Sequence, residues 1–150
     1  MDSLSRCVIR HGCQFGVAFD GDSDALMAVD ESGQIIQPDQ LGGLLALILL
    51  QRHPGGRIIH QPTTSPHVID AIHAAGGRPL ATHDNAKESV QASMVDKNAL
   101  FGITNSGNYF YEDMHFTDNA LRSLIELING LAGQSQPLSV LTQSLNMDAP

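Results

Sequence analysis

Short apolar runs alternate with segments of helical spacing along most of the chain. The short runs end at Gly, Pro, Asp or Ser and are typical of buried strands. The other segments repeat apolar residues at helical intervals, which indicates amphipathic helices. Strands are predicted over residues 15–19, 25–30, 34–36, 57–61, 78–83, 100–104 and 109–111. Helices are predicted over residues 4–13, 38–52, 66–75, 87–95, 118–132 and 137–145.

The order of these elements predicts the fold class. Strands that alternate with helices of this length favour a three-layer α/β/α sandwich. The first two predicted strands flank a tight turn, so they are expected to pair as a hairpin and to make the sheet mixed. Residues 1–134 are expected to form one domain, and residues 135–150 a linker or tail toward a next domain.

Three apolar patterns predict where side chains pack. The run at residues 41–50 has helical spacing and is expected to lie in the core. The aromatic residues 109–111 could stack on a sugar, but packing within a strand is the preferred interpretation. One face of the helix at 118–132 is predicted to carry Leu121, Leu124, Ile125 and Ile128.

Composition narrows the class of protein. The chain has 150 residues, 42% of them hydrophobic, and a formal net charge of −8 with only two lysines. An acidic chain of this kind is a poor partner for nucleic acid or an anionic membrane. Residues 41–50 are too few to span a bilayer, and the first residues lack a signal-peptide pattern. Cys7 and Cys13 fit no metal or disulfide framework, so reduced thiols and a cytoplasmic protein are expected.

The most informative motif is an acidic turn directly after the first strand. Asp20, Asp22 and Asp24 alternate there, and three carboxylates this close repel one another unless a cation lies among them. Mg²⁺ is suited to this role because it takes oxygen ligands and needs only a few carboxylates. A solvated hairpin turn is the alternative. A calcium EF-hand is disfavoured, since Ala25 stands where its loop needs glycine and strands flank the turn.

Other reactive residues fit no catalytic pattern. The seven histidines are scattered without the spacing of a zinc protease and are expected to be structural or at the surface. Ser65 precedes a proline and is interpreted as a helix cap. Ser106 lacks the glycine pattern that surrounds a hydrolase nucleophile. A small hydrolase is therefore disfavoured, because the sequence offers no pair of nucleophile and base.

Four segments, in order, resemble one known family. The first, GVAFDGDSDALMAVDESG, is similar to the metal-binding loop of the α-D-phosphohexomutases, whose pattern is Asp-Gly-Asp-x-Asp-Arg. These are the phosphomannomutases and phosphoglucomutases. A later segment, LFGITNSGNYFYED, resembles their sugar-binding segment Gly-Gly-Glu-x-Ser-Gly-His. The other two similar segments are IIHQPTTSPHVIDAIHAAGGRPLATH and FTDNALRSLIELINGLA.

The resemblance implies both a fold and a role. It points to the third of four domains in the family, with a four-stranded, mainly parallel sheet of order 2-1-3-4 that contains one antiparallel strand. It implies that Asp20, Asp22 and Asp24 hold Mg²⁺ together with a phosphoserine of another domain. Ser106 and Gly107 match the sugar-binding segment. A hexose phosphate would then bind only with the missing domains, and the chain alone would be inactive.

Departures from the family pattern support a second hypothesis. Ala25 replaces the arginine, Thr104 the glutamate and Asn108 the histidine. Asp84 stands near the place where the family often has a lysine. Loss of a carboxylate that contacts a sugar hydroxyl costs about 1.5–3 kcal/mol. The alternative is therefore a stand-alone, degenerate domain that acts as a binding or interaction module.

Overall fold

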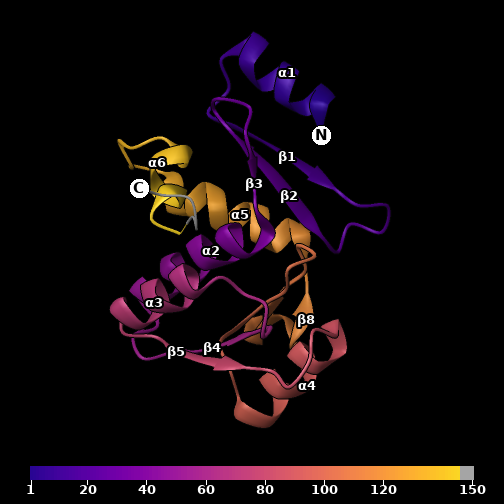
Figure 1. Cartoon of the computed structure of the whole chain (residues 1–150), viewed down its shortest axis with the longest axis vertical. Helices are drawn as coiled ribbons and strands as arrows, with labels where there is room; N and C mark the ends of the chain where they lie inside the picture. Colours follow the sequence, from indigo (N-terminus) through magenta and orange to yellow (C-terminus); the bar gives the residue numbers. More distant parts are fainter. Residues whose placement is uncertain (146–150) are drawn as a thin grey trace.

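The computed structural model describes residues 1–145, which form two sheets with helices packed on and between them (Figure 1). The strands are β1 (Phe15–Phe19), β2 (Leu26–Asp30), β3 (Ile35–Ile36), β4 (Arg57–His60), β5 (Arg78–Ala81), β6 (Phe101–Ile103), β7 (Tyr109–Tyr111) and β8 (Thr117–Asp118). The helices are α1 (Asp2–His11), α2 (Pro38–Arg52), α3 (Pro66–Ala74), α4 (Lys87–Lys97), the 3₁₀ helix η1 (Glu112–Met114), α5 (Ala120–Leu131) and α6 (Leu138–Gln143).

The larger sheet confirms the predicted α/β class. Its order is β5-β4-β6-β7-β8, with β4 parallel to both β5 and β6, and with β7 and β8 antiparallel. When the strands of this sheet are numbered in chain order from β4, the strands β4, β5, β6 and β7 have the expected 2-1-3-4 arrangement. The sheet has five strands rather than the expected four, because the two-residue β8 pairs with β7 at the edge.

The predicted place of the hairpin is wrong. β1 and β2 do pair, but together with β3 they form a separate antiparallel sheet. A single bridge between Ala25 and Asn108 joins this sheet to the larger one. The inner side chains of β2, including Leu26 and Ala28, belong to the same buried cluster as α2. The larger sheet is mixed because β7 runs antiparallel to its neighbours β6 and β8, and not because of the hairpin.

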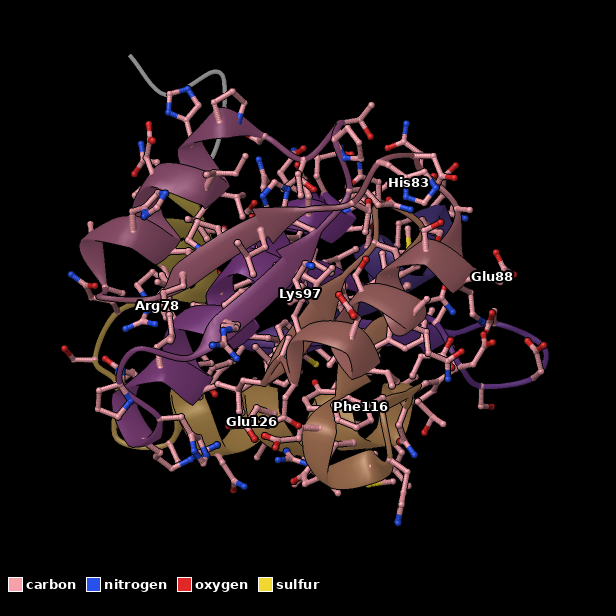
Figure 2. The ribbon with its side chains drawn as sticks, turned by 90° about the horizontal axis from the view of Figure 1, so that it is seen from below. Arg78, His83, Glu88, Lys97, Phe116 and Glu126 are labelled. Atoms are coloured by element: carbon pink, nitrogen blue, oxygen red, sulfur yellow. The ribbon has the colours of Figure 1, made fainter. Side chains whose placement is uncertain are left out.

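Side chains that alternate along the central strands divide the core in two. Ile58 belongs to a buried cluster with α2, and Ile59 belongs to a second cluster with Val90 and Met94 of α4. Accordingly α2 and α3 lie on one side of the larger sheet and α4 on the other (Figure 1). In Figure 2, Glu88 and Lys97 mark the two ends of α4 on its side of the sheet. These are the three predicted layers.

Two packing predictions are confirmed. The apolar run of α2 is buried, and the helix lies between β2, β6, α3, α5 and α6. A Cβ added at Gly42 of α2 would lie 2.6 Å from Ile103 Cγ2, which shows how closely helix and sheet approach. The aromatic side chains of Tyr109, Phe110 and Tyr111 are at most 1% exposed. They therefore pack within the protein and are not available to stack on a sugar.

The apolar stripe of α5 faces outward. Leu121, Ile125 and Ile128 share a face, as their spacing predicts, and are 60%, 48% and 49% exposed. The buried face of α5 instead includes Ser123 and Glu126, whose polar groups are hydrogen bonded. The helix thus leaves an apolar surface uncovered by the described chain.

The segment expected to be a tail begins with a packed helix. Leu138 of α6 and the following Leu145 are buried in the same cluster as α2. Residues 146–150 lie outside the described part of the chain. The division into a domain at 1–134 and a tail at 135–150 stays a prediction. Among the described helices, none is long and apolar enough to cross a membrane. Cys7 and Cys13 are free and exposed.

Candidate functional site

Residues 20–24, here called the Asp loop, join β1 to β2 and extend beyond the two strands (Figure 1). Each of Asp20, Asp22 and Asp24 offers one carboxylate oxygen, and these three atoms lie within 4.8 Å of one another. Asp20 Oδ1 accepts the N–H groups of Asp24 (3.1 Å) and Ala25 (3.0 Å). Ser23 has a φ of 62° in the left-handed region. These features fold the loop so that the three carboxylates meet.

Lys87, the first residue of α4, contacts the Asp loop. Its Nζ lies 2.6 Å from Asp24 Oδ2 and 2.6 Å from Asp118 Oδ2. The hydrogen bond from Lys87 is the largest cause of the lowered pKa of Asp24. Burial opposes the charge on Lys87, but its bonds to Asp118 and Asp24 outweigh burial and raise its pKa. The lysine is therefore a charged bridge between two carboxylates.

The loop at residues 104–108, between β6 and β7, continues this network. Asn108 Nδ2 donates to Asp118 Oδ2 (2.9 Å), and Ser106 Oγ donates to Asn108 Oδ1 (2.8 Å). Thr104 Oγ1 is buried and donates to the Asn108 carbonyl (2.9 Å). The side chains that replace the family's glutamate and histidine are thus satisfied within the protein. Hydrogen bonds connect Ser106 to Asp24 through Asn108, Asp118 and Lys87.

Gly107 holds the Asp loop against this second loop. Its carbonyl accepts the N–H of Leu26 (2.9 Å), directly after the bridge at Ala25. Its φ is +89°, and an added Cβ would lie 2.8 Å from Leu26 O. Any side chain at this position would be strained and would push the two loops apart. The structure therefore places two groups of sequence-predicted residues on adjacent loops: Asp20, Asp22 and Asp24 on one, and Ser106 and Gly107 on the other.

Sequence reasoning missed Lys87 and Asp118. It placed Asp84 near the expected lysine, but Asp84 Oδ1 accepts the N–H of Ala86 (3.0 Å) before α4, and Lys87 reaches the Asp loop instead. One signal was available. A cation at the first position of a helix opposes the helix dipole, so Lys87 at the start of a predicted helix needs an acidic partner.

A second polar cluster lies beside the site, where the parallel strands end. Thr63 Oγ1 donates to Asn85 Oδ1 (2.7 Å) and accepts from Asn105 Nδ2 (2.8 Å). Gln61 Nε2 donates to Asn85 O (2.6 Å), and its Oε1 accepts from Asn105 N (2.8 Å). These bonds tie together the loops that follow β4, β5 and β6. The strands that follow β4 in the chain, β5 and β6, lie on opposite sides of it, so the strand order reverses at β4. Crevices at such a switch point are the usual ligand sites of open α/β sheets.

Two buried polar residues, His60 and Ser65, flank this cluster in the sequence. His60 is buried, and burial lowers its pKa. Ser65 is the residue before α3, as predicted, but its hydroxyl makes no capping bond. Its Oγ is buried and finds no hydrogen-bond partner among the described residues, while its N–H donates to Asp39 Oδ2 (2.9 Å). The cap interpretation therefore holds for the position of Ser65 and is wrong for its side chain.

The Asp loop has the donor set for a hard divalent cation. Oxygens bound to Mg²⁺ lie about 2.0–2.1 Å from the metal, so opposite ligands are about 4.2 Å apart. The 4.8 Å span of the three carboxylates exceeds this by little, and the exposed Asp22 can close it by side-chain rotation. Carboxylate oxygens are the ligands that Mg²⁺ prefers. The residues present therefore fit the ion.

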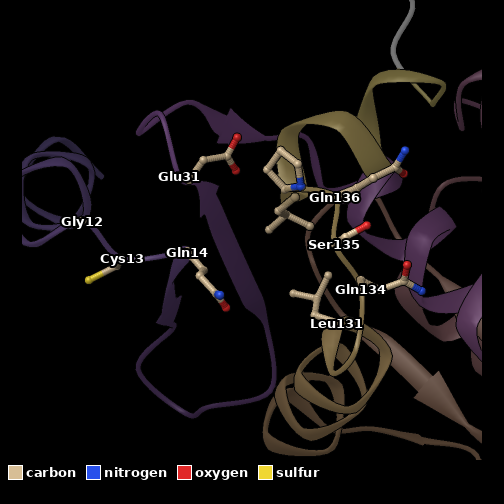
Figure 3. Close-up of a pocket in the computed structure, with 10 residues that line it drawn as sticks. Gly12, Cys13, Gln14, Glu31, Leu131, Gln134, Ser135 and Gln136 are labelled. Atoms are coloured by element: carbon tan, nitrogen blue, oxygen red, sulfur yellow. The ribbon is translucent and has the colours of Figure 1, made fainter.

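A cavity of about 310 Å³ lies at the other end of the hairpin (Figure 3). It opens between Gln14 and Glu31, which flank β1 and β2, and the segment 134–138, which ends at the first residue of α6. Figure 3 shows the Cys13 thiol turned away from that segment. None of the three aspartates lines this cavity. The Asp loop and the cavity are therefore separate features of the hairpin.

Comparison with known proteins assigns the domain. The family described as phosphoglucomutase/phosphomannomutase, alpha/beta/alpha domain III, matches residues 37–147. Phosphomannomutase of Escherichia coli K12 is 34% identical over 120 residues, which cover 80% of this chain and 26% of that protein. Phosphohexose mutases of Xanthomonas campestris are 30% identical over 134 residues, or 89% of this chain and 30% of theirs. The chain spans about a quarter to a third of these relatives.

A solved structure supports the same assignment. The phosphoglucomutase/phosphomannomutase family protein of Burkholderia thailandensis superposes with a TM-score of 0.87 at 29% identity. The superposition covers 97% of this chain and 32% of that one, so it includes the hairpin as well as the larger sheet. Together with the match of residues 37–147, this shows that the chain belongs to the phosphoglucomutase/phosphomannomutase family, of which it carries the α/β/α domain III.

Proposed function

We propose that this chain is the Mg²⁺-binding domain of a phosphomannomutase- or phosphoglucomutase-type enzyme and is not catalytic alone. The observation that carries the proposal is the meeting of three carboxylates at the Asp loop, within 4.8 Å, beside the loop at 104–108. The relatives are a phosphomannomutase and phosphohexose mutases, which supports a hexose phosphate as substrate.

Each group in the site has a definite chemical task under this proposal. Asp20, Asp22 and Asp24 would hold Mg²⁺, which neutralises charge on a phosphoryl group during transfer. Ser106 Oγ is the group at the 104–108 loop that can exchange an internal hydrogen bond for one to a sugar hydroxyl. Gly107 acts by shape, because its carbonyl is already bonded to Leu26. The phosphoserine and the phosphate-binding loop of the family would come from other domains.

The test is a Mg²⁺ titration followed by amide NMR. We expect shifts centred on residues 19–25, because the cation binds there and the loop is exposed. Asp22→Asn should abolish them, since it removes a ligand but no hydrogen bond of the loop. Asp96→Asn, an exposed aspartate on α4, is the matched control and should leave them unchanged. A wild-type chain that shows no loop shift at millimolar Mg²⁺ would contradict the metal role.

A second measurement tests the inactivity of the isolated chain. The purified chain should not interconvert hexose 1-phosphates and 6-phosphates, because Asp20, Asp22 and Asp24 supply charge compensation and no phosphoryl carrier. Any interconversion that disappears with Asp22→Asn would show that this chain is a complete catalyst. Interconversion that survives Asp22→Asn would point to a contaminating enzyme, and repurification would remove it.

One observation favours a second candidate function, a binding or interaction module. The exposed apolar stripe of α5, formed by Leu121, Ile125 and Ile128, is available for contact with another protein or domain. The mass of the native protein in its source cells, measured by immunoblot, separates the two candidates. A species several times heavier than 16.1 kDa supports the enzyme domain. A band near that mass supports the module.

A further inference from the structure

Lys87 occupies part of the site that a cation would need. Its Nζ lies 2.6 Å from Asp24 Oδ2, and Asp24 is one of the three aspartates of the Asp loop. Asp20 Oδ1 is occupied by two backbone N–H groups, so Asp20 cannot supply a second oxygen in place of Asp24 without giving up these bonds. A divalent cation at the loop must therefore share Asp24 with the ammonium group of Lys87.

Asp118 gives the ammonium group a second place to bind. Its Oδ2 lies 2.6 Å from Lys87 Nζ and also accepts a hydrogen bond from Asn108 Nδ2 (2.9 Å). Lys87 can therefore release Asp24 and stay fully paired by keeping Asp118. Its position at the first residue of α4 is otherwise unfavourable for a cation, which indicates that the two carboxylates hold it there.

We infer that Lys87 is a built-in counter-ion of the Asp loop, which competes with the divalent cation for Asp24 and moves onto Asp118 when the cation binds. The inference rests on the proposed metal role of the loop. It makes Lys87 a positioning residue, because it acts on the cation through Asp24. It also makes Asp118 part of the site without being a ligand.

The experiment measures Mg²⁺ affinity by amide NMR in the wild type and in Lys87→Met. A unit charge and a divalent ion about 5 Å apart in water interact strongly enough to change affinity by about tenfold, and about 0.1 M salt leaves most of this interaction because its Debye length is about 10 Å. We expect Lys87→Met to bind Mg²⁺ about tenfold more tightly, and Lys87→Arg to stay close to the wild type. Loss of a cation at a helix N-terminus favours the helix, so the Met variant should remain folded.

The matched control is Lys97→Met. It makes the same change in net charge on the same helix, but Lys97 pairs with Asp96 at the opposite end of α4. It should change the affinity less than about twofold, because salt screens charges separated by more than about 10 Å. An equal gain from both lysine variants would mean that net charge alone is responsible, and would overturn the inference.

A second readout follows the ammonium group itself. Asn108 Nδ2 bonds the same Asp118 oxygen as Lys87, so its side-chain amide signals should move when Mg²⁺ drives Lys87 onto Asp118. In Lys87→Met those signals should not respond to Mg²⁺, although the loop signals still do. Weaker binding by Lys87→Met would show that the lysine is only a structural clamp. If the wild-type loop signals respond to Mg²⁺ and Lys87→Met binds with unchanged affinity, the inference fails while the proposed function stands. If neither protein responds to Mg²⁺, the inference and the proposed function both fail.

Discussion

The buried carboxylate of Glu126 is expected to be a large single contributor to the stability of this fold. Its side chain is 2% exposed and contacts Arg52 of α2 and Arg122 of α5. Arg122 also pairs with Asp113 (3.2 Å) and lies 4.9 Å from the ring centroid of Tyr111. Figure 2 shows Glu126 on the side of the molecule away from the Asp loop. The network therefore ties α2, α5 and η1 together without touching the candidate site.

We expect Glu126→Gln to lower the free energy of unfolding by about 2–3 kcal/mol. Each hydrogen bond to a charged group contributes about 1.5–3 kcal/mol, and two are weakened. The loss is below the full sum because Arg52 is half exposed and can return to water, while the amide keeps one acceptor. For a domain of this size, the loss lowers Tm by about 4–12 °C.

Urea denaturation followed by circular dichroism measures this change, with Arg52→Met as the matched variant. Removal of Arg52 leaves Glu126 paired with Arg122, so that variant should lose only about 1 kcal/mol. The reasoning is refuted if the free energy of unfolding of Glu126→Gln lies within about 0.5 kcal/mol of the wild-type value, because an ordinary surface substitution has an effect of that size. It is also refuted if Arg52→Met is the more damaging change.

Two further predictions concern the hairpin and the core. Burial opposes the charge on Glu31, but hydrogen bonds from Ser139 and nearby backbone N–H groups together outweigh it and hold the pKa of Glu31 below its ordinary value. Their stabilisation is therefore present above the ordinary glutamate pKa and is lost as pH falls through the lower folded value. The Ser139 amide shift should titrate in that range, and Glu31→Gln should remove the titration. Gly42→Ala should destabilise the domain by about 1–2 kcal/mol in urea, because overpacking against Ile103 exceeds the gain in helix propensity. Gly21→Ala, with open space around it, should have little effect; equal losses would refute the packing argument.

Local patterns in the sequence were sufficient for most of the elements. The apolar spacing of α2 and the proline at its start predicted both the helix and its burial. The Gly-Gly pairs after α2 and α3 predicted where those helices end. The three aspartates were recognisable because ligand spacing within one loop is a local property. These features depend on residues close together in the chain, so a single sequence contains them.

The place of the hairpin was misjudged, and the direction of the apolar face of α5 was not predicted, because their partners are distant in sequence. Nothing in residues 15–30 indicates whether β2 pairs with the larger sheet or packs on α2. The start of β2 is instead fixed by the distant loop at residues 104–108, where the carbonyl of Gly107 accepts the N–H of Leu26. On α5, Leu121, Ile125 and Ile128 point outward. The buried face also holds Glu126, whose charge is neutralised by arginines of α2 and α5. The apolar spacing alone predicted which residues share this face of α5, but not whether the face points into the core or toward the surface.

The charge balance of the candidate site is a property of the fold rather than of the motif. Lys87 is 63 residues from Asp24 in the chain, and Asp118 comes from a two-residue strand at the sheet edge. The loop motif lacks the family's arginine at Ala25, yet the structure still brings one cation to the loop from α4. Substitutions at Lys87 or Asp118 would therefore change the site by a full charge while every residue of the Asp loop stays intact. A test limited to Asp20, Asp22 and Asp24 would therefore leave out Lys87 and Asp118, on which the proposed cation affinity of the loop depends.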